Sequence, residues 1–392
     1  MPWKNASTMD QKVEFINEFN SGLYTLSELC RAFEISRPTA YLLISRYQNL
    51  GLKGLELQPR APYSHPNRTS QEVEDKIIQL RKAHRTWGAR KIHKLLQQDF
   101  PLEMIPSTVT VNNIMNRNGL ILPRRKLRRV TPQYPIFDPD QPNQIWSADY
   151  KGKFKMGNGT YCHPFTVADS KSRFLFSAKA HHREDFLSVR STLKRIFKEY
   201  GMPQQFHTDN GSPFGSTRAI ARFSRLSYWL IDLGILPVFS DPGKPQQNGR
   251  HERMHRDLKA CCTRPPAFNL KAQQRKLNDF VVEYNQVRPH EALDMETPAS
   301  VHSFSKRSYP DKIEPFEYQH PLTAVYVTKN GAIRWKSYYW VYMARGLAGK
   351  YIGIEELGQG IWRVFYRNLF LGYFDESKLL KEKTIRLTQD MV

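Results

Sequence analysis

The segment 144–259 alternates short apolar runs, typical of strands, with longer amphipathic runs, typical of helices. Strands are expected at 145–155, 161–169, 174–180, 205–208 and 235–239, and helices at 184–200, 217–233 and 245–259. Gly157-Asn158-Gly159 is typical of a hairpin turn after the first strand. Three strands in succession, followed by strands that alternate with helices, predict an α/β fold in which helices cover a sheet.

This order of elements is that of a ribonuclease H-like core, which we assign to residues 144–305. Three acidic residues in it stand out. Asp149 lies in the first strand, and Asp209 ends a later one, where Asn210-Gly211 turns the chain. Glu252 lies on the helix after the turn region 243–249. Because Mg²⁺ prefers carboxylate oxygens, we expect Asp149, Asp209 and Glu252 to hold two Mg²⁺, with Mn²⁺ as a substitute.

Each of these acids also has an ordinary interpretation, since a single Asp or Glu is usually a cap or an ion-pair partner. Three other acids are rivals for the site. Asp169 is interpreted as a turn residue, Asp241 as a loop acid, and Asp257 as a surface partner of Arg253 or Arg256. His251 and His255 are spaced i, i+4 on one helix, but they lack the further ligands that zinc needs.

Residues 1–50 are expected to form a helix-turn-helix DNA-binding domain. Thr8, Thr25 and Ser36 can cap three short helices, and Pro38 is tolerated in a first helical turn. Arg37 and Thr39 at the start of the third helix are candidate DNA contacts. A plain three-helix bundle is the alternative. Residues 51–69, rich in Gly and Pro, are expected to be a linker.

A second helix-turn-helix domain is expected at 70–122. Its helices begin near Ser70, after Trp87-Gly88, and at Ser107. Candidate DNA contacts are Arg90, Lys91, Ser107 and Thr108. Two such domains in series would read a longer DNA site than one.

The segment 123–143 is expected to be a basic, Pro-rich linker. Phosphate contact is favoured over a solvated tether for its cations, Arg124, Arg125, Lys126, Arg128 and Arg129. Five or six short strand patterns at 316–380 predict a small C-terminal β-barrel. The fold class is therefore multidomain α/β: helical N-terminal modules, a ribonuclease H-like core and a small β-barrel.

Composition points to a polyanionic partner. Lys and Arg number 59 against 37 Asp and Glu, a net charge of +22 in 392 residues. We expect no membrane contact, because no apolar run is long enough to span a bilayer and the start lacks a signal-peptide core. The four cysteines show no metal-ligand spacing and fit a reduced cytoplasm.

Three stretches together resemble the DDE transposases of bacterial insertion sequences, which share the retroviral-integrase catalytic core. They are Trp146-Ser147-Ala148-Asp149-Tyr150, His207-Thr208-Asp209-Asn210-Gly211 and Gln247-Asn248-Gly249-Arg250-His251-Glu252. Tyr284-Asn285-Gln286-Val287-Arg288-Pro289-His290 and Thr297-Pro298-Ala299 are also similar to this family. The stretch between Asp209 and Glu252 is longer than in the retroviral-type motif.

The resemblance implies a DNA transposase that binds insertion-sequence ends. It would cleave DNA with metal-held water and join the freed 3′-OH to target DNA. Asp149 would bridge the two ions, and Asp209 and Glu252 would each hold one. Cations expected to face phosphates are Lys244, Arg250, Arg253, Arg256 and Lys259. The family further implies double-stranded DNA as partner, a dimer or higher oligomer, and a cytoplasmic, nucleoid-associated location in bacteria.

Two other functions remain open from the sequence. One is a DNA-binding regulator with an inactive core, against which an intact triad argues. The other is a structure-specific nuclease that cuts without joining. Two helix-turn-helix domains favour sequence-specific DNA ends as the substrate instead.

Overall fold

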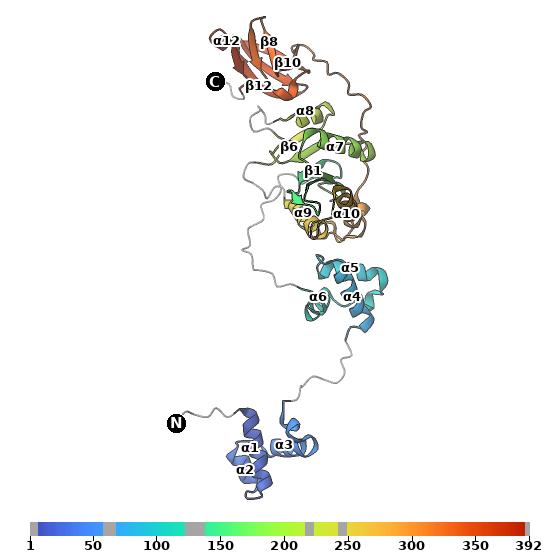
Figure 1. Ribbon diagram of the computed structural model, residues 1–392, viewed down its shortest axis with the longest axis vertical. Helices are drawn as coiled ribbons and strands as arrows, with labels where there is room; N and C mark the ends of the chain where they lie inside the picture. The colour runs from blue at the N-terminus through green and yellow to red at the C-terminus, as the bar shows by residue number, and fades with distance from the viewer. Residues whose placement is uncertain (1–6, 58–67, 122–137, 216–222, 242–248, 389–392) are drawn as a thin grey trace. The chain divides into compact units, whose positions relative to one another are not determined.

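The computed structural model describes residues 7–57, 68–121, 138–215, 223–241 and 249–388 (Figure 1). The chain divides into two compact units, residues 1–68 and 69–392. Across the described residues, no helix combines the length and the apolar character needed to cross a membrane.

The first unit is a three-helix domain, with α1 (Thr8–Ser21), α2 (Leu26–Ala32) and α3 (Arg37–Leu50). Ser7, not Thr8, caps α1. The Ser7 hydroxyl accepts from the Asp10 N–H, and the Asp10 carboxylate accepts from the Ser7 N–H. Thr25 and Ser36 cap the other helices as predicted. The helices pack around buried apolar side chains: Phe15, Ile16, Leu29, Cys30, Ala40, Leu43, Ile44 and Leu55.

Leu55 belongs to this core, although the sequence suggested a linker from residue 51. Gly51–Leu55 forms a short 3-10 helix, η1, and the Leu55 side chain is 1% exposed. Gly54 allows the approach, because a Cβ there would stand 2.2 Å from the Arg46 carbonyl oxygen. Lys12 also donates to the Leu55 carbonyl at 2.9 Å. The residues of the expected linker from 58 to 67 lie outside the described part.

The second unit begins with α4 (Gln71–Ala83), α5 (Ala89–Asp99), the 3-10 turn η2 (Leu102–Met104) and α6 (Thr108–Arg117). Their apolar faces form one cluster that includes Ile77, Trp87, Ile92 and Ile114. Arg81 ties the loops together by donating to the carbonyls of Trp87 and Leu120. These helices form where the sequence placed a second helix-turn-helix domain.

The α/β core is built on a mixed sheet. Its strands are β1 (Ile145–Tyr150), β2 (Phe154–Lys155), β3 (Tyr161–Asp169), β4 (Leu175–His181), β5 (Gln205–Thr208) and β6 (Leu236–Phe239). β3 pairs antiparallel with β1, β2 and β4, while β5 pairs parallel with β1 and β6. The predicted strand order along the chain is confirmed, except that the first strand breaks after Tyr150.

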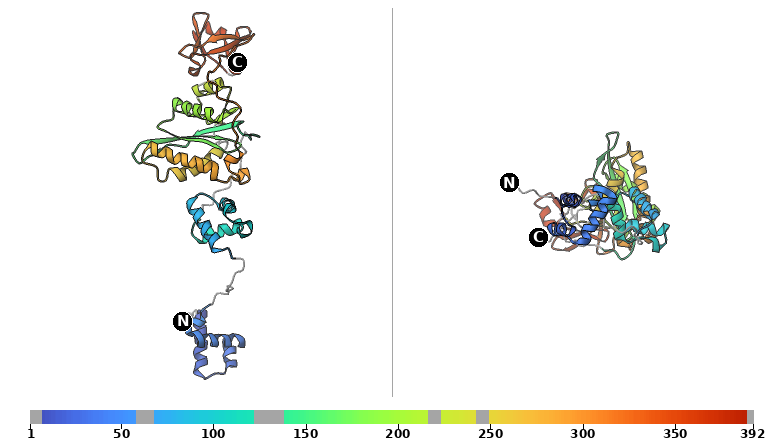
Figure 2. Two further views of the ribbon diagram at one scale, coloured as in Figure 1. Left: turned by 90° about the vertical axis from the view of Figure 1, so that its right-hand side faces the viewer. Right: turned by 90° about the horizontal axis from the view of Figure 1, so that it is seen from below.

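Helices cover both faces of this sheet (Figures 1 and 2). α7 (Phe186–Tyr200) and α8 (Arg225–Asp232) share one buried cluster with Trp146, Phe165 and Phe206. α9 (Gly249–Cys262) and α10 (Leu270–Val282) share a second cluster, with Leu175 and Ala178. The sheet is therefore the middle of three layers, as expected for an α/β core.

The helix expected over 269–304 is shorter than predicted. α10 passes into the π-helical turn η5 (Glu283–Val287), and the helix ends there, because Pro289 disfavours helical geometry at Arg288. Two short pieces follow, η6 (Glu291–Leu293) and α11 (Pro298–Val301).

The C-terminal part is β-rich, but its described strands do not close into the expected barrel. One sheet has the order β12 (Leu369–Asp375), β11 (Ile361–Tyr366), β10 (Tyr351–Gly358) and β7 (Thr323–Tyr326). The other has β13 (Thr384–Arg386), β9 (Tyr339–Tyr342) and β8 (Ala332–Trp335). The short pieces η7 (Arg345–Leu347) and α12 (Glu376–Leu379) complete this part. The two sheets share one apolar cluster, which also takes in Tyr228 and Ile231 of α8.

Candidate active site

The parallel strands β1 and β5 bring Asp149 and Asp209 to the same edge of the sheet. Ser147 lies opposite His207 in their register. This is the last pair between the two strands, and Asp149 and Asp209 each follow two residues further along the chain. Neighbouring strands run about 5 Å apart, and ligand sites of α/β sheets lie beyond the carboxyl ends of strands.

Successive side chains of β1 point to opposite faces of the sheet, and this alternation decides which face Asp149 belongs to. Trp146 and Ala148 enter the cluster under α7 and α8. Ser147 and Asp149 therefore belong to the opposite face, which α9 covers. The Ser147 hydroxyl lies 3.0 Å from His251 Nδ1, and Asp149 Oδ2 lies 3.7 Å from His255 Nδ1. Both histidines are on α9.

Glu252 lies on this same helix, but on its exposed side. Met254, His255 and Leu258 are buried beneath α9, whereas Glu252 is exposed in the first turn. Among the described residues, no group of three or more His, Cys, Asp or Glu side chains is arranged to hold a metal ion. Asp149 and Asp209 thus lie at the carboxyl ends of neighbouring parallel strands, and Glu252 lies on the helix whose His255 is near Asp149.

Asp209 is a carboxylate in a desolvated place. Burial is the main reason that its pKa is raised, and the negative charge of Glu184 raises it further. The Gly211 N–H donates to Asp209 Oδ1 at 3.3 Å, and this hydrogen bond lowers the pKa of Asp209. A desolvated anion beside a second carboxylate is what a divalent cation would stabilise, so the donor chemistry fits Mg²⁺.

Glu184, just before α7, is an acid near the site that the sequence analysis did not select. Its carboxylate also lies 2.8 Å from His163 Nδ1. In the sequence, Glu184 and Asp185 look like ordinary acids at a helix start, and Asp185 does cap α7. No local signal separates Glu184 from such a role.

His255 connects α9 to β3 and supports Asp149. Thr166 of β3 donates its hydroxyl hydrogen to the Asp149 carbonyl at 3.0 Å, so it must accept from His255 Nε2, 2.7 Å away. We therefore assign the Nε2–H tautomer, whose unprotonated Nδ1 faces Asp149. Burial lowers the pKa of His255 to about 2, with His251 adding to the effect. The ring is neutral, and its contact with Asp149 is not a salt bridge.

His251 is the second buried histidine of α9. Burial, followed by His207, lowers its pKa to about 4. It contacts Ser147, and the site thus contains neutral imidazoles and carboxylates rather than ion pairs. The spacing of His251 and His255 in the sequence suggested only zinc ligation, whereas their packing role follows from the contacts to Ser147 and Thr166.

The cations expected to face phosphates differ in their surroundings: one is hydrogen-bonded within the protein, and others are exposed to solvent. Arg250 donates to the Ser170 carbonyl at 3.0 Å and to Asp138 at 2.8 Å. Side chains on the open face of α9 are exposed: Arg253, Arg256 and Lys259. Several candidates lie outside the described residues: Lys244, Arg124, Arg125, Lys126, Arg128 and Arg129.

Asp257 is not a surface partner of Arg253 or Arg256, as the sequence suggested. It is buried and accepts from Arg288, which is also buried. Because Arg288 comes from beyond α10, this pairing has no local signal. Asp169 is the turn acid that was predicted, since its carboxylate accepts from the backbone N–H groups of Lys171 and Ser172.

In the first helix-turn-helix domain, Arg37 donates to the Ser27 hydroxyl at 2.8 Å, and Thr39 is exposed at the start of α3. In the second, Ser107 caps α6 by accepting from the Thr110 N–H, and Thr108 is half-buried. The hydroxyl of Ser107 is thus engaged in the cap.

Arg90 and Lys91 on α5 face acidic and cationic groups of the segment after α10. Arg90 pairs with Glu291 at 3.4 Å, and Lys94 pairs with Glu296 at 3.1 Å. Burial is the main reason that the pKa of Lys91 falls to about 8, and the positive charge of Arg288 contributes to this shift. Residues of α5 are therefore paired with the segment after α10, whereas one face of α6 is exposed.

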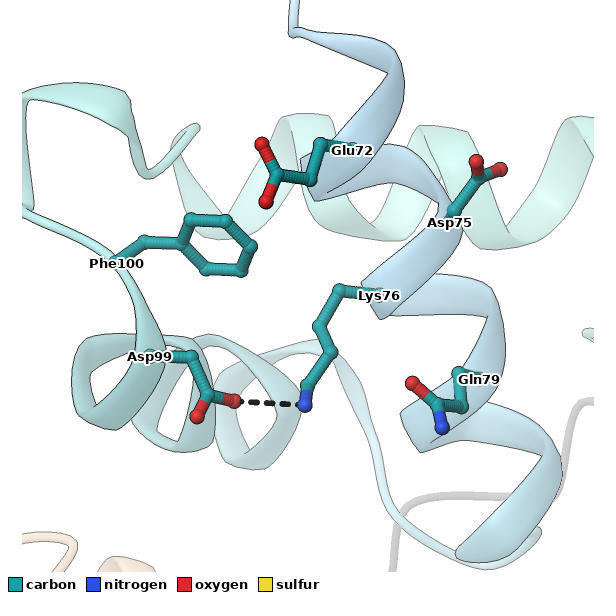
Figure 3. Close-up of a pocket in the computed structure, with 6 residues that line it drawn as sticks. All are labelled: Glu72, Asp75, Lys76, Gln79, Asp99 and Phe100. Carbon is teal, nitrogen blue, oxygen red and sulfur yellow. Dashed lines mark ion pairs between the residues drawn. The ribbon is translucent and has the colours of Figure 1, made fainter.

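A pocket in the second domain lies apart from the carboxylates of the core. It is lined by residues of α4 and of the end of α5: Glu72, Asp75, Lys76, Gln79, Asp99 and Phe100 (Figure 3). Lys76 reaches across it to Asp99 at 2.9 Å.

The α/β core is integrase-like. Sequence-family models agree: an integrase core domain matches residues 139–245, and a second integrase core domain matches 233–298. A helix-turn-helix domain matches residues 11–63, and a homeodomain-like domain matches 39–115. The chain therefore carries an integrase core preceded by helix-turn-helix domains.

Similar proteins include mobile-element proteins. The "Insertion element IS476 uncharacterized 39.2 kDa protein" of Xanthomonas euvesicatoria is 25% identical over 74% of this chain and 82% of its own length. The transposase for transposon Tn552 of Staphylococcus aureus is 21% identical over 72% of the chain and 64% of its own length. The resemblance to insertion-sequence transposases is confirmed.

Viral proteins match the core more narrowly. The Pro-Pol polyprotein of Simian foamy virus type 3 is 29% identical over 42% of the chain, which spans only 15% of that polyprotein. The HTLV-2 integrase catalytic core domain in complex with magnesium is 18% identical over 42% of this chain and all of that one, with a TM-score of 0.32. A simian T-cell lymphotropic virus intasome chain is 16% identical over 75% of this chain and 97% of that one, with a TM-score of 0.36.

Proposed function

We propose that the protein is a DNA transposase that binds the ends of an insertion element and catalyses metal-dependent cleavage and strand transfer. The observation that supports the proposal is the parallel pairing of β1 and β5, since Asp149 and Asp209 each follow the last paired residues, Ser147 and His207, by two positions. Glu252 lies on α9, the helix whose His255 packs beside Asp149.

Asp149, Asp209 and Glu252 would hold two Mg²⁺, for which Mn²⁺ can substitute. When bound, the ions would supply activation of the attacking oxygen and stabilisation of the leaving oxygen. The chain's own residues orient the carboxylates: Thr166 fixes the Asp149 backbone, and Gly211 donates to Asp209. The exposed cations Arg253, Arg256 and Lys259 would hold the DNA backbone near these carboxylates.

The partners follow from the same assignment. The helix-turn-helix domains would bind the double-stranded ends, and the basic α9 face would meet end and target DNA. Joining two ends requires a dimer or higher oligomer.

The test is strand transfer of a labelled element-end duplex into plasmid with Mg²⁺. Wild type is compared with Asp149→Asn, Asp209→Asn and Glu252→Gln, and with Glu199→Gln as an exposed acid of the same core. We expect joined product to fall by more than about 100-fold in the three triad variants, beyond the usual cost of losing a supporting hydrogen bond. DNA binding should persist, and Glu199→Gln should remain active.

Two results would contradict the proposal. Binding of a verified end without any chemistry in wild type would make the protein a DNA-binding regulator with an inactive core. Cleavage without joined product would make it a structure-specific nuclease.

A further inference from the structure

The open face of α6 carries an unusual set of side chains. Val111, Ile114 and Met115 point into the cluster of the second domain. On the other side, Val109 is 67% exposed and Asn112, Asn113 and Asn116 are exposed. Their spacing is i, i+3, i+4 and i+7, so they form one stripe along the helix. We call these four residues the α6 stripe.

Helix stability does not account for this stripe. Asparagine and valine are both weaker helix formers than alanine, and exposing the apolar valine side chain to water does not stabilise the fold. The three carboxamides make no side-chain hydrogen bond to any other described residue. By contrast, Arg117 on the same helix pairs with Glu74, and Asn118 donates to the Ile114 carbonyl at 2.8 Å. The stripe is a set of exposed donors, acceptors and methyl groups without charge.

These groups match one ligand chemistry. A carboxamide can donate to N7 and accept from N6 of adenine at once, and a valine methyl packs on the thymine methyl. A B-DNA major groove is about 12 Å wide and admits a helix. Because the stripe holds no cation, it suits base edges rather than phosphates. Phosphate attraction is supplied by the rest of a chain with net charge +22.

The other helix of this motif is engaged elsewhere. On α5, Arg90 pairs with Glu291 and Lys94 with Glu296. Lys91 is half-buried near Arg288. The open face of α6 therefore remains for DNA.

We propose that α6 is the sequence-reading helix of the second domain and that the α6 stripe recognises A·T base pairs in the major groove of the element end. This rests on the proposed function only in taking DNA as the partner. It adds the substrate class, an A·T-rich segment, and it names the residues that read it.

The experiment is selection of duplexes from a randomised pool by the full-length chain in metal-free buffer, so that no cleavage intervenes. Binding of the selected duplexes is then measured by fluorescence anisotropy. The variants are Val109→Ala, Asn112→Ala, Asn113→Ala and Asn116→Ala. Asn17→Ala, at an exposed asparagine on α1, is the matched control, and Asn278→Ala, whose Oδ1 accepts from Gln274 on α10, is a second control. Alanine favours helix, so the variants are expected to fold, and thermal melting checks this.

We expect wild type to select a short A·T-rich block. Each asparagine variant should lose about 10- to 100-fold of its discrimination against G·C at one or two positions of that block. Affinity for unrelated duplexes and the slope of affinity against salt should not change, since no phosphate contact is removed. Asn17→Ala and Asn278→Ala should both select the wild-type block.

Three results would overturn the inference: a selected block with G·C at these positions, variants that keep the wild-type block, or variants that weaken all duplexes equally. The outcome is separable from the proposed function. A·T selection without strand transfer would leave the inference standing and remove the transposase. Strand transfer by a chain whose choice of DNA ends does not depend on the α6 stripe would support the transposase and remove the inference.

Discussion

The imidazole Nδ1 of His255 lies 3.7 Å from Oδ2 of Asp149, and its Nε2 holds the Thr166 hydroxyl at 2.7 Å. One histidine thus links α9, which carries Glu252, to the strand that carries Asp149. Because Nδ1 carries no proton, the ring supports Asp149 through Thr166, whose hydroxyl donates to the Asp149 carbonyl. The relative position of Asp149 and Glu252 therefore depends on a residue that would touch neither DNA nor metal.

Replacing His255 with Ala is expected to lower strand transfer by about 10- to 100-fold, the usual cost of losing a supporting group of a metal site. The Mg²⁺ concentration for half-maximal activity should rise, while binding of the element end stays unchanged. His255→Asn, which keeps a donor, should recover part of the activity. A loss of thermal stability with no change in Mg²⁺ dependence would instead assign His255 a purely structural role.

Asp209→Asn is expected to stabilise the metal-free protein. The raised pKa means that the folded state holds the proton more tightly than the unfolded state. Stability from this group is therefore lost as pH rises above the ordinary value of 3.8, and at neutral pH the charge is unfavourable. Asparagine removes that charge.

Melting with and without Mg²⁺ checks this expectation. Wild type should gain about 2.7 kcal/mol at a Mg²⁺ concentration 100 times the Kd, and Asp209→Asn should gain much less. If the variant melts lower without metal and still responds fully to Mg²⁺, Asp209 is not a ligand.

Asp232 at the end of α8 accepts from Lys350 and Tyr366 of the C-terminal β-rich part and forms an ion pair with Arg367. Its side chain is 10% exposed. Asp232→Ala would leave the Tyr366 hydroxyl and the cations without this acceptor, and we expect a loss of about 3 kcal/mol in the free energy of unfolding. Urea denaturation measures it, and Glu317→Ala, an exposed acid, serves as control. Equal stability of the two variants would show that the contact is weak.

Acid should destabilise the core through His181. This ring accepts from the Tyr150 hydroxyl at Nδ1 and donates from Nε2 to Thr192, whose own hydroxyl donates to the Ser188 carbonyl. Burial is the main reason that its pKa falls to about 4, from an ordinary 6.5. The unfolded chain therefore takes up a proton before the folded chain does, and stability is lost as pH falls from about 6.5 toward 4.

The urea midpoint at pH about 7.5 and about 5 tests this pH dependence. His181→Gln removes the titrating group, so its midpoint should change less than that of wild type. The exposed neighbour His182 provides the control variant His182→Gln, which should behave like wild type. A His181→Gln variant as acid-sensitive as wild type would place the effect elsewhere.

Much of the fold was predictable because its signals are local. Apolar periodicity located α7 and β3, and the Ser36 cap located the start of α3. Asp149 and Asp209 could be selected because they are acidic residues within or at the end of predicted strands. Local signals did not separate neighbouring residues with the same capping tendency: Thr8 was the predicted cap of α1, but Ser7 is the cap.

The sequence by itself determined which residue types could perform the chemistry and which elements carry them. Only the tertiary structure decided their partners. Asp257 pairs with Arg288, His255 with Thr166, and Asp232 with Tyr366, each across a long stretch of chain. It also buried Leu55 and divided the C-terminal strands between two sheets. Local periodicity reports only how one segment folds, whereas burial and charge pairing depend on which distant segments meet, and no local pattern encodes that.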